Sequence, residues 1–128
     1  MKKLFTLIFS LLFTANIFAG EFPDISITDL KKAIDDKKVT VIDVNGSDSW
    51  KAGHVPTAID FDSAGDKIAD KLPKDKAALV VAYCGGPGCN AYSAAAKKAK
   101  ALGYTNVKHL AAGLSGWKKA GEKTEAGK

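Results

Sequence analysis

The sequence contains no arginine, and it has only two cysteines and two histidines among its 128 residues. Without arginine a loop cannot hold a phosphate with a planar pair of N–H donors, which disfavours a phosphatase. Two cysteines without nearby histidines are too few for a four-ligand zinc site, and the Cys-x-x-Cys-His haem attachment motif is absent. We therefore expect neither a metal nor another cofactor.

The basic residues are all lysine, and they outnumber the acidic residues to give a formal net charge of +5. They are scattered singly and in pairs among aspartates, and basic and aromatic residues do not interleave. This pattern is typical of a solvated surface, so we do not expect nucleic acid as a partner. A small anionic substrate is compatible with the mild positive charge.

Long apolar runs are confined to the start of the chain. Lys2 and Lys3 precede an apolar stretch that continues to Phe18, and the small residues Ala19 and Gly20 follow. These features predict a secretory signal peptide over residues 1–19, which is too short for a stable membrane span. We expect the mature protein to be one domain, residues 20–128, without a membrane span and located in the periplasm or secreted.

Short β-branched runs alternate with helical patterns along this domain. This alternation predicts a three-layer α/β fold in which helices flank a central, mainly parallel sheet. We expect a charged, frayed tail from Gly121 onward. The expected strands lie near residues 25–27, at 39–44, at 78–83 and at 107–110, with a short one near 59. One expected helix begins at Thr28. The other expected helices cover residues 47–52, 68–72, 91–102 and 114–120.

The most informative stretch is the buried strand pattern of residues 78–83, which stops abruptly at Cys84. The carboxyl ends of strands are where open α/β sheets place their chemistry. Gly85, Gly86 and Gly88 let the backbone curl, so that its N–H groups can point at an anion such as a thiolate or a persulfide. A cysteine at the amino end of the following helix should be a good nucleophile. The alternative is an inert, buried cysteine.

The second cysteine, Cys89, is separated from Cys84 by the sequence Gly-Gly-Pro-Gly. The glycines permit a tight turn, so the two thiols can approach within disulfide range. Three roles for Cys89 are open: a resolving thiol that attacks a Cys84 persulfide or sulfenate, a structural disulfide that locks the loop, and an incidental free thiol.

Five short motifs occur in an order that resembles the rhodanese-like (sulfurtransferase) domain family. They are Val-Ile-Asp-Val at 41–44, Gly-His-Val-Pro-Thr-Ala-Ile at 53–59, Val-Ala-Tyr-Cys at 81–84, Leu-Gly-Tyr-Thr-Asn-Val at 102–107 and Ala-Gly-Leu-Ser-Gly-Trp at 112–117. The resemblance implies that Cys84 accepts a sulfane sulfur as a persulfide and passes it to cyanide or to a thiol, including a protein thiol. The persulfide-binding loop would then comprise Gly85, Gly86, Gly88, Cys89 and Asn90.

The loop departs from the family pattern because it contains no cation. Lys51, which lies ahead of Gly53-His54, is the candidate substitute, and Asn45 stands where the family often has arginine. An uncharged loop favours polysulfide or a low-molecular persulfide as the sulfur donor over doubly charged thiosulfate.

Asp43 and His54 are possible supporting residues. Asp43 follows a neighbouring strand, where it can orient the loop or act electrostatically, or else be a buried carboxylate bonded to turn amides. His54 can transfer protons or make a structural hydrogen bond. We expect His109 to be an ordinary core or surface histidine.

A second class of function is compatible with the same residues. Cys84 and Cys89 can cycle between dithiol and disulfide in a redox module, or the domain can dock a partner without catalysis. Changing Cys89 discriminates between the classes, because a redox module needs both thiols.

Overall fold

The computed structural model describes residues 22–128, so the signal peptide expected at residues 1–19 lies outside the described part. Within residues 22–128, none of the helices has the length and apolar character needed to cross a membrane.

The centre of the domain is a sheet of four parallel strands in the order β2-β1-β3-β4. Asp43 pairs with Tyr83, and Tyr83 pairs with Leu110, so three of the strands end at the same edge of the sheet. The prediction of an α/β domain with a parallel sheet is therefore confirmed. The strands are β1 (Thr40–Asp43), β2 (Ile59–Asp60), β3 (Val80–Tyr83) and β4 (Val107–Leu110).

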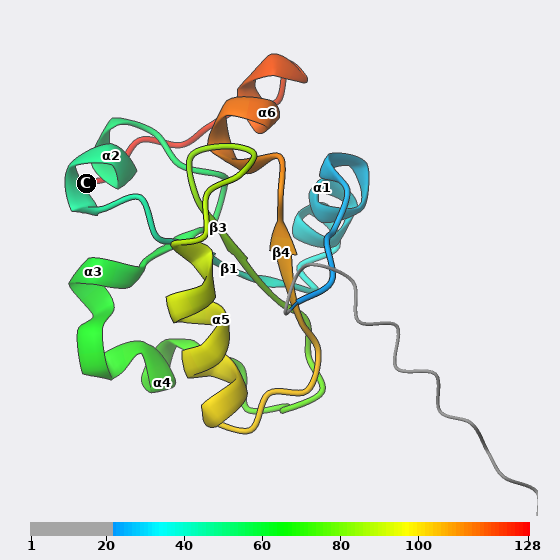
Figure 1. Cartoon of the computed structure of the whole chain (residues 1–128), viewed down its shortest axis with the longest axis vertical. Coiled ribbons are helices and arrows are strands. Elements are labelled where there is room, and N and C mark those ends of the chain that lie inside the picture. The colour runs from blue at the N-terminus through cyan, green and yellow to red at the C-terminus, as the bar shows by residue number, and fades with distance from the viewer. Residues whose placement is uncertain (1–21) are drawn as a thin grey trace, which may run out of the picture.

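Helices cover both faces of this sheet, because a parallel sheet needs crossover connections that return each strand to the same end. Figure 1 shows α1 and α6 on one face and α3, α4 and α5 on the other. The helices are α1 (Ile27–Asp35), α2 (Ser47–Ala52), α3 (Phe61–Ala64), α4 (Ile68–Lys71), α5 (Tyr92–Ala101) and α6 (Gly113–Lys119), with a 3-10 turn at Gly65–Lys67 between α3 and α4.

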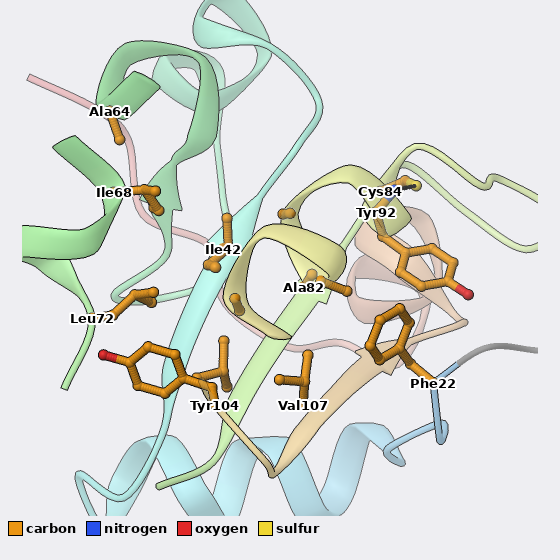
Figure 2. Packing of buried hydrophobic residues seen from close by; sticks show 14 residues of the cluster. Phe22, Ile42, Ala64, Ile68, Leu72, Ala82, Cys84, Tyr92, Tyr104 and Val107 are labelled. Carbon is orange, nitrogen blue, oxygen red and sulfur yellow. Dashed lines mark hydrogen bonds between the residues drawn. The ribbon is translucent and has the colours of Figure 1, made fainter. Parts of the chain in front are cut away.

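Two hydrophobic layers form the core, one on each face of the sheet. Alternation along β3 directs Ala82 and Cys84 into the layer under α5, and Val81 and Tyr83 into the layer under α1 and α6. Figure 2 shows the first layer, in which Cys84 lies beside Tyr92. Tyr83 points to the opposite side of the strand from the cysteine.

The beginning of the domain differs from the sequence prediction. Ile25 bonds through its N–H to the carbonyl of His109 at 2.8 Å, but the chain makes only a single bridge to β4, at Asp24, instead of a strand over residues 25–27. The helix then begins at Ile27 and not at Thr28, because the Ser26 hydroxyl accepts the Asp29 N–H at 3.0 Å. Serine and threonine both favour the N-cap position, so the residue types alone did not show whether Ser26 or Thr28 caps the helix.

The expected frayed tail is also wrong, because it packs against the domain. Glu125 and His54 exchange two backbone hydrogen bonds of 2.9 Å, and the Gly127 N–H donates to the Lys51 carbonyl at 3.0 Å. Figure 1 shows the C-terminus beside α2. Backbone pairing of this kind does not depend on side-chain hydrophobicity, so a charged composition did not reveal it.

Candidate functional site

Cys84 is the first residue after β3 and lies at the carboxyl end of the sheet. It is only 4% exposed, and its Sγ accepts a hydrogen bond of 3.1 Å from the N–H of Tyr92, the first residue of α5. The unpaired N–H groups and the dipole of a helix amino end favour negative charge. This position would favour a thiolate over a thiol at Cys84 whenever the cysteine is reduced.

Cys89 forms a disulfide with Cys84, and the two Cα atoms lie 6.1 Å apart. The intervening turn is closed by a hydrogen bond from Cys89 N–H to the Gly86 carbonyl at 3.3 Å. Gly88 adopts a φ of +83°, a left-handed conformation that glycine tolerates best. The bond shows that the two sulfur atoms can reach each other, which both a resolving thiol and a structural disulfide require.

A cavity of about 190 Å³ lies beside the disulfide, between the loop after β3 and the end of β4. No lysine, aspartate or glutamate contributes to its described lining, so it suits a small ligand of low charge. The lining residues are Cys84, Gly86, Gly88, Cys89, Asn90, Tyr92, His109, Leu110 and Ala111. Gly85, which was expected in the persulfide-binding loop, is exposed and does not line the cavity.

The loop is anchored by the amino end of α6. Leu114 N–H donates to the Cys84 carbonyl at 2.9 Å, and Ser115 N–H donates to the Gly85 carbonyl at 2.8 Å. Gly113 has a φ of +63°, and a Cβ at this position would lie 2.4 Å from the backbone nitrogen of Gly86. Only glycine allows α6 to approach the loop this closely.

Comparisons with known proteins show the family and the fold. The model of the rhodanese-like domain family matches residues 26–120. The chain belongs to the rhodanese-like domain family. Among curated proteins, it is 34% identical over 93 residues to the HTH-type transcriptional regulator Rv0324 of Mycobacterium tuberculosis. That match covers 70% of this chain but only 39% of the regulator, so the chain spans less than half of that relative.

Solved structures share the fold. BH2092 protein from Bacillus halodurans is 30% identical with a TM-score of 0.69, and the match covers 81% of this chain and 77% of that one. Thiosulfate sulfurtransferase from Pseudomonas aeruginosa is 23% identical with a TM-score of 0.64, over 83% of this chain and 20% of that one. The second likeness is one of fold alone.

Asp43 of this rhodanese-like domain is fully buried and does not line the cavity. Its carboxylate accepts the Asn45 N–H at 2.7 Å and the Tyr83 hydroxyl, and that hydroxyl accepts the Val55 N–H at 3.0 Å. Burial raises the pKa of the Asp43 carboxyl, while the bonds from Tyr83 and Asn45 oppose the increase. Burial, and next the bond to Asp43, raise the pKa of Tyr83. Asp43 thus has the contacts of a structural carboxylate, bonded to one backbone amide and to one buried hydroxyl.

Lys51 and His54 lie away from the cysteine. Lys51 lines a separate cavity of about 380 Å³ together with Trp50 and Asp60. His54 is 4% exposed, its Nδ1 is 2.7 Å from the Trp50 carbonyl oxygen, and its ring stacks on the Trp50 ring at 4.2 Å. The structure therefore brings neither residue to the cavity at Cys84, and His54 has the contacts of an architectural residue.

His109 lines the cavity although the sequence indicated only an ordinary histidine. Its ring stacks on the Tyr92 ring at a centroid distance of 4.2 Å, and within residues 22–128 its buried Nδ1 has no hydrogen-bond partner. This position follows from the strand order and register, which the sequence alone did not specify. His109 pairs with Ala82 on β3, two residues before Cys84, so alternation places it on the same face as the cysteine.

Proposed function

We propose that the chain is an exported sulfurtransferase that carries sulfane sulfur as a persulfide on Cys84 and delivers it to a thiol. The observation that carries the proposal is the Cys84 sulfur, which accepts the first N–H of α5 and borders a small cavity. A thiolate is the nucleophile for sulfane sulfur, and a persulfide is an anion that the same helix end can stabilise. The sulfurtransferase among the fold neighbours supports this chemistry.

The absence of lysine, aspartate and glutamate from the described lining of the cavity favours a particular class of donor. Thiosulfate carries two charges that need a cation or several N–H donors when they leave water. No lysine lies among the lining residues, and Lys51 lines a different cavity. We infer that polysulfide or a low-molecular persulfide is the better donor. The proposed location, periplasmic or secreted, rests on the signal-peptide pattern of residues 1–19.

The direct test measures thiocyanate formation from polysulfide and cyanide by the reduced protein, with a protein-free blank. The activity of Cys84→Ser should be at least about 1,000-fold lower than that of wild type, because a hydroxyl is not ionised at neutral pH. The variant should retain the wild-type circular dichroism spectrum. Retention of activity by Cys84→Ser would show that another group carries the sulfur. Thiosulfate, used as a second donor, should give the slower rate.

The Cys84–Cys89 disulfide favours a second candidate function, thiol–disulfide exchange without sulfur transfer. Cys89→Ala separates the two candidates. A pure redox module would lose all activity in this variant, whereas a sulfurtransferase would still gain a sulfur atom, about 32 Da, on Cys84. Intact mass spectrometry of reduced Cys89→Ala after incubation with polysulfide decides between them.

A further inference from the structure

The disulfide places Cys89 where it can act on a persulfide. The Sγ atoms of Cys84 and Cys89 are bonded, so the reach of Cys89 extends to the inner sulfur of a Cys84 persulfide. Cys84 itself is 4% exposed, and the adjoining cavity holds only about 190 Å³. A bulky external thiol therefore reaches the inner sulfur less readily than Cys89, which belongs to the same loop and has a high effective concentration.

From this geometry, and resting on the proposed persulfide at Cys84, we propose that Cys89 resolves the persulfide and that the domain is a thiol-driven sulfane-sulfur reductase that releases hydrosulfide. The Cys89 sulfur forms a bond to Cys84 Sγ, and the bond between Cys84 Sγ and the outer sulfur breaks. The outer sulfur takes the Cys89 proton and leaves as hydrosulfide. The sulfane sulfur gains two electrons, and the two cysteines lose them as they become a disulfide.

The same geometry indicates how the disulfide is reduced. Cys89 is more exposed than Cys84, so an incoming thiol attacks the sulfur of Cys89 and forms a mixed disulfide there. Cys84 then leaves as a thiolate, which is stabilised by the Tyr92 N–H. A second thiol resolves the mixed disulfide. Each cycle consumes one persulfide and two thiols, and it yields one hydrosulfide and one external disulfide besides the thiol left by the donor.

A single-turnover experiment tests this inference. The protein is reduced, desalted and mixed with one equivalent of glutathione persulfide, and intact mass and released sulfide are measured together. Wild type should release about one equivalent of sulfide and end about 2 Da lighter, as the disulfide. Cys89→Ser should retain about 32 Da on Cys84 and release sulfide at least about 100-fold more slowly until thiol is added. Cys84→Ser serves as the blank for sulfide that the donor itself releases.

The other outcomes separate this inference from the proposed function. If wild type retains the added 32 Da and Cys89 can still be alkylated, or if Cys89→Ser releases sulfide at the wild-type rate, Cys89 does not resolve the persulfide. The sulfurtransferase proposal stands in both cases. If neither wild type nor Cys89→Ser gains sulfur, the proposed function fails and the inference fails with it.

Discussion

The neighbouring strands β1 and β3 each end at or directly before a side chain that can ionise, but the surroundings of the two side chains differ. At the end of β1, Asp43 is fully buried and its carboxylate accepts two hydrogen bonds, from Asn45 and Tyr83. At the end of β3, the Cys84 Sγ accepts one hydrogen bond, borders a cavity and is bonded to the sulfur of Cys89. The carboxyl edge of the sheet therefore holds one side chain with structural contacts and one that borders a cavity. The hydrogen-bond donors around each side chain distinguish the two positions.

The two ends are also held in place by different contacts. The β1 end depends on side chains, because Tyr83 links Asp43 to the backbone of Val55. The β3 end depends on backbone bonds from α6 to the carbonyls of Cys84 and Gly85. The bonds from α6 engage only the backbone at Cys84 and not its side chain. Substitutions at the two strand ends test this difference.

The largest effect on stability is expected from Gly113→Ala. The left-handed conformation costs about 1–2 kcal/mol for alanine, and the overlap with the backbone of Gly86 adds about 1–3 kcal/mol. Urea denaturation should show a loss of about 3–4 kcal/mol, and displacement of the loop should lower sulfur uptake by Cys84. Gly121→Ala is the matched control, because Gly121 has a φ of +78° but no atom within 4 Å of the added methyl group. Equal losses in the two variants would mean that α6 does not fix the loop.

Tyr83→Phe tests the other strand end. It removes the donor to Asp43 and leaves the buried N–H of Val55 without its acceptor, so the free energy of unfolding should fall by about 3 kcal/mol. Tyr104→Phe is the control, because its hydroxyl makes a single bond to the Pro73 carbonyl and should cost about 1 kcal/mol. A loss in Tyr83→Phe no larger than that of the control would show that the Asp43 network contributes little.

The sequence could predict those features of the fold and of the site that depend on residues close together in the chain. Glycines directly after an apolar run placed Cys84 at a strand end, and regular spacing placed α5 immediately behind the loop. The short helices were harder, because four residues show no helical period. The helix α3, for example, depends on the Asp60 carboxylate, which accepts N–H groups from Asp62 and Ser63.

The parts that could not be predicted depend on contacts between distant residues. The position of His109 beside Tyr92 follows from the order of the strands and not from its own neighbours in sequence. Lys51 follows the motif order of the family but lines another cavity, and its carbonyl accepts the Gly127 N–H from the distant C-terminal segment. Spacing along the chain therefore predicted the position of Cys84 at a strand end but not the residues that line the cavity beside it.

Reduction of the Cys84–Cys89 disulfide should have a smaller effect than either substitution. Closing so short a loop contributes about 2 kcal/mol through the entropy of the unfolded chain. Urea denaturation of wild type with and without a reductant measures the difference, and Cys89→Ser, which cannot form the bond, should not respond to the reductant. A loss well above that of Tyr83→Phe would mean that the disulfide is a principal structural element of the domain and not an adjunct to its chemistry.

The smallest effect is the pH dependence contributed by Asp43. Burial raises the pKa of its carboxyl above the ordinary value of 3.8, so the folded state binds this proton more tightly than the unfolded state does. The free energy of unfolding of wild type, measured relative to Asp43→Asn, should therefore fall as pH rises from 3.8 to the raised value and stay level above it. The total fall is about 1.4 kcal/mol for each unit by which the pKa is raised. A difference that grows with pH would mean that the Tyr83 and Asn45 hydrogen bonds outweigh burial, and Asp43 would then be a carboxylate that its hydrogen bonds stabilise as an anion.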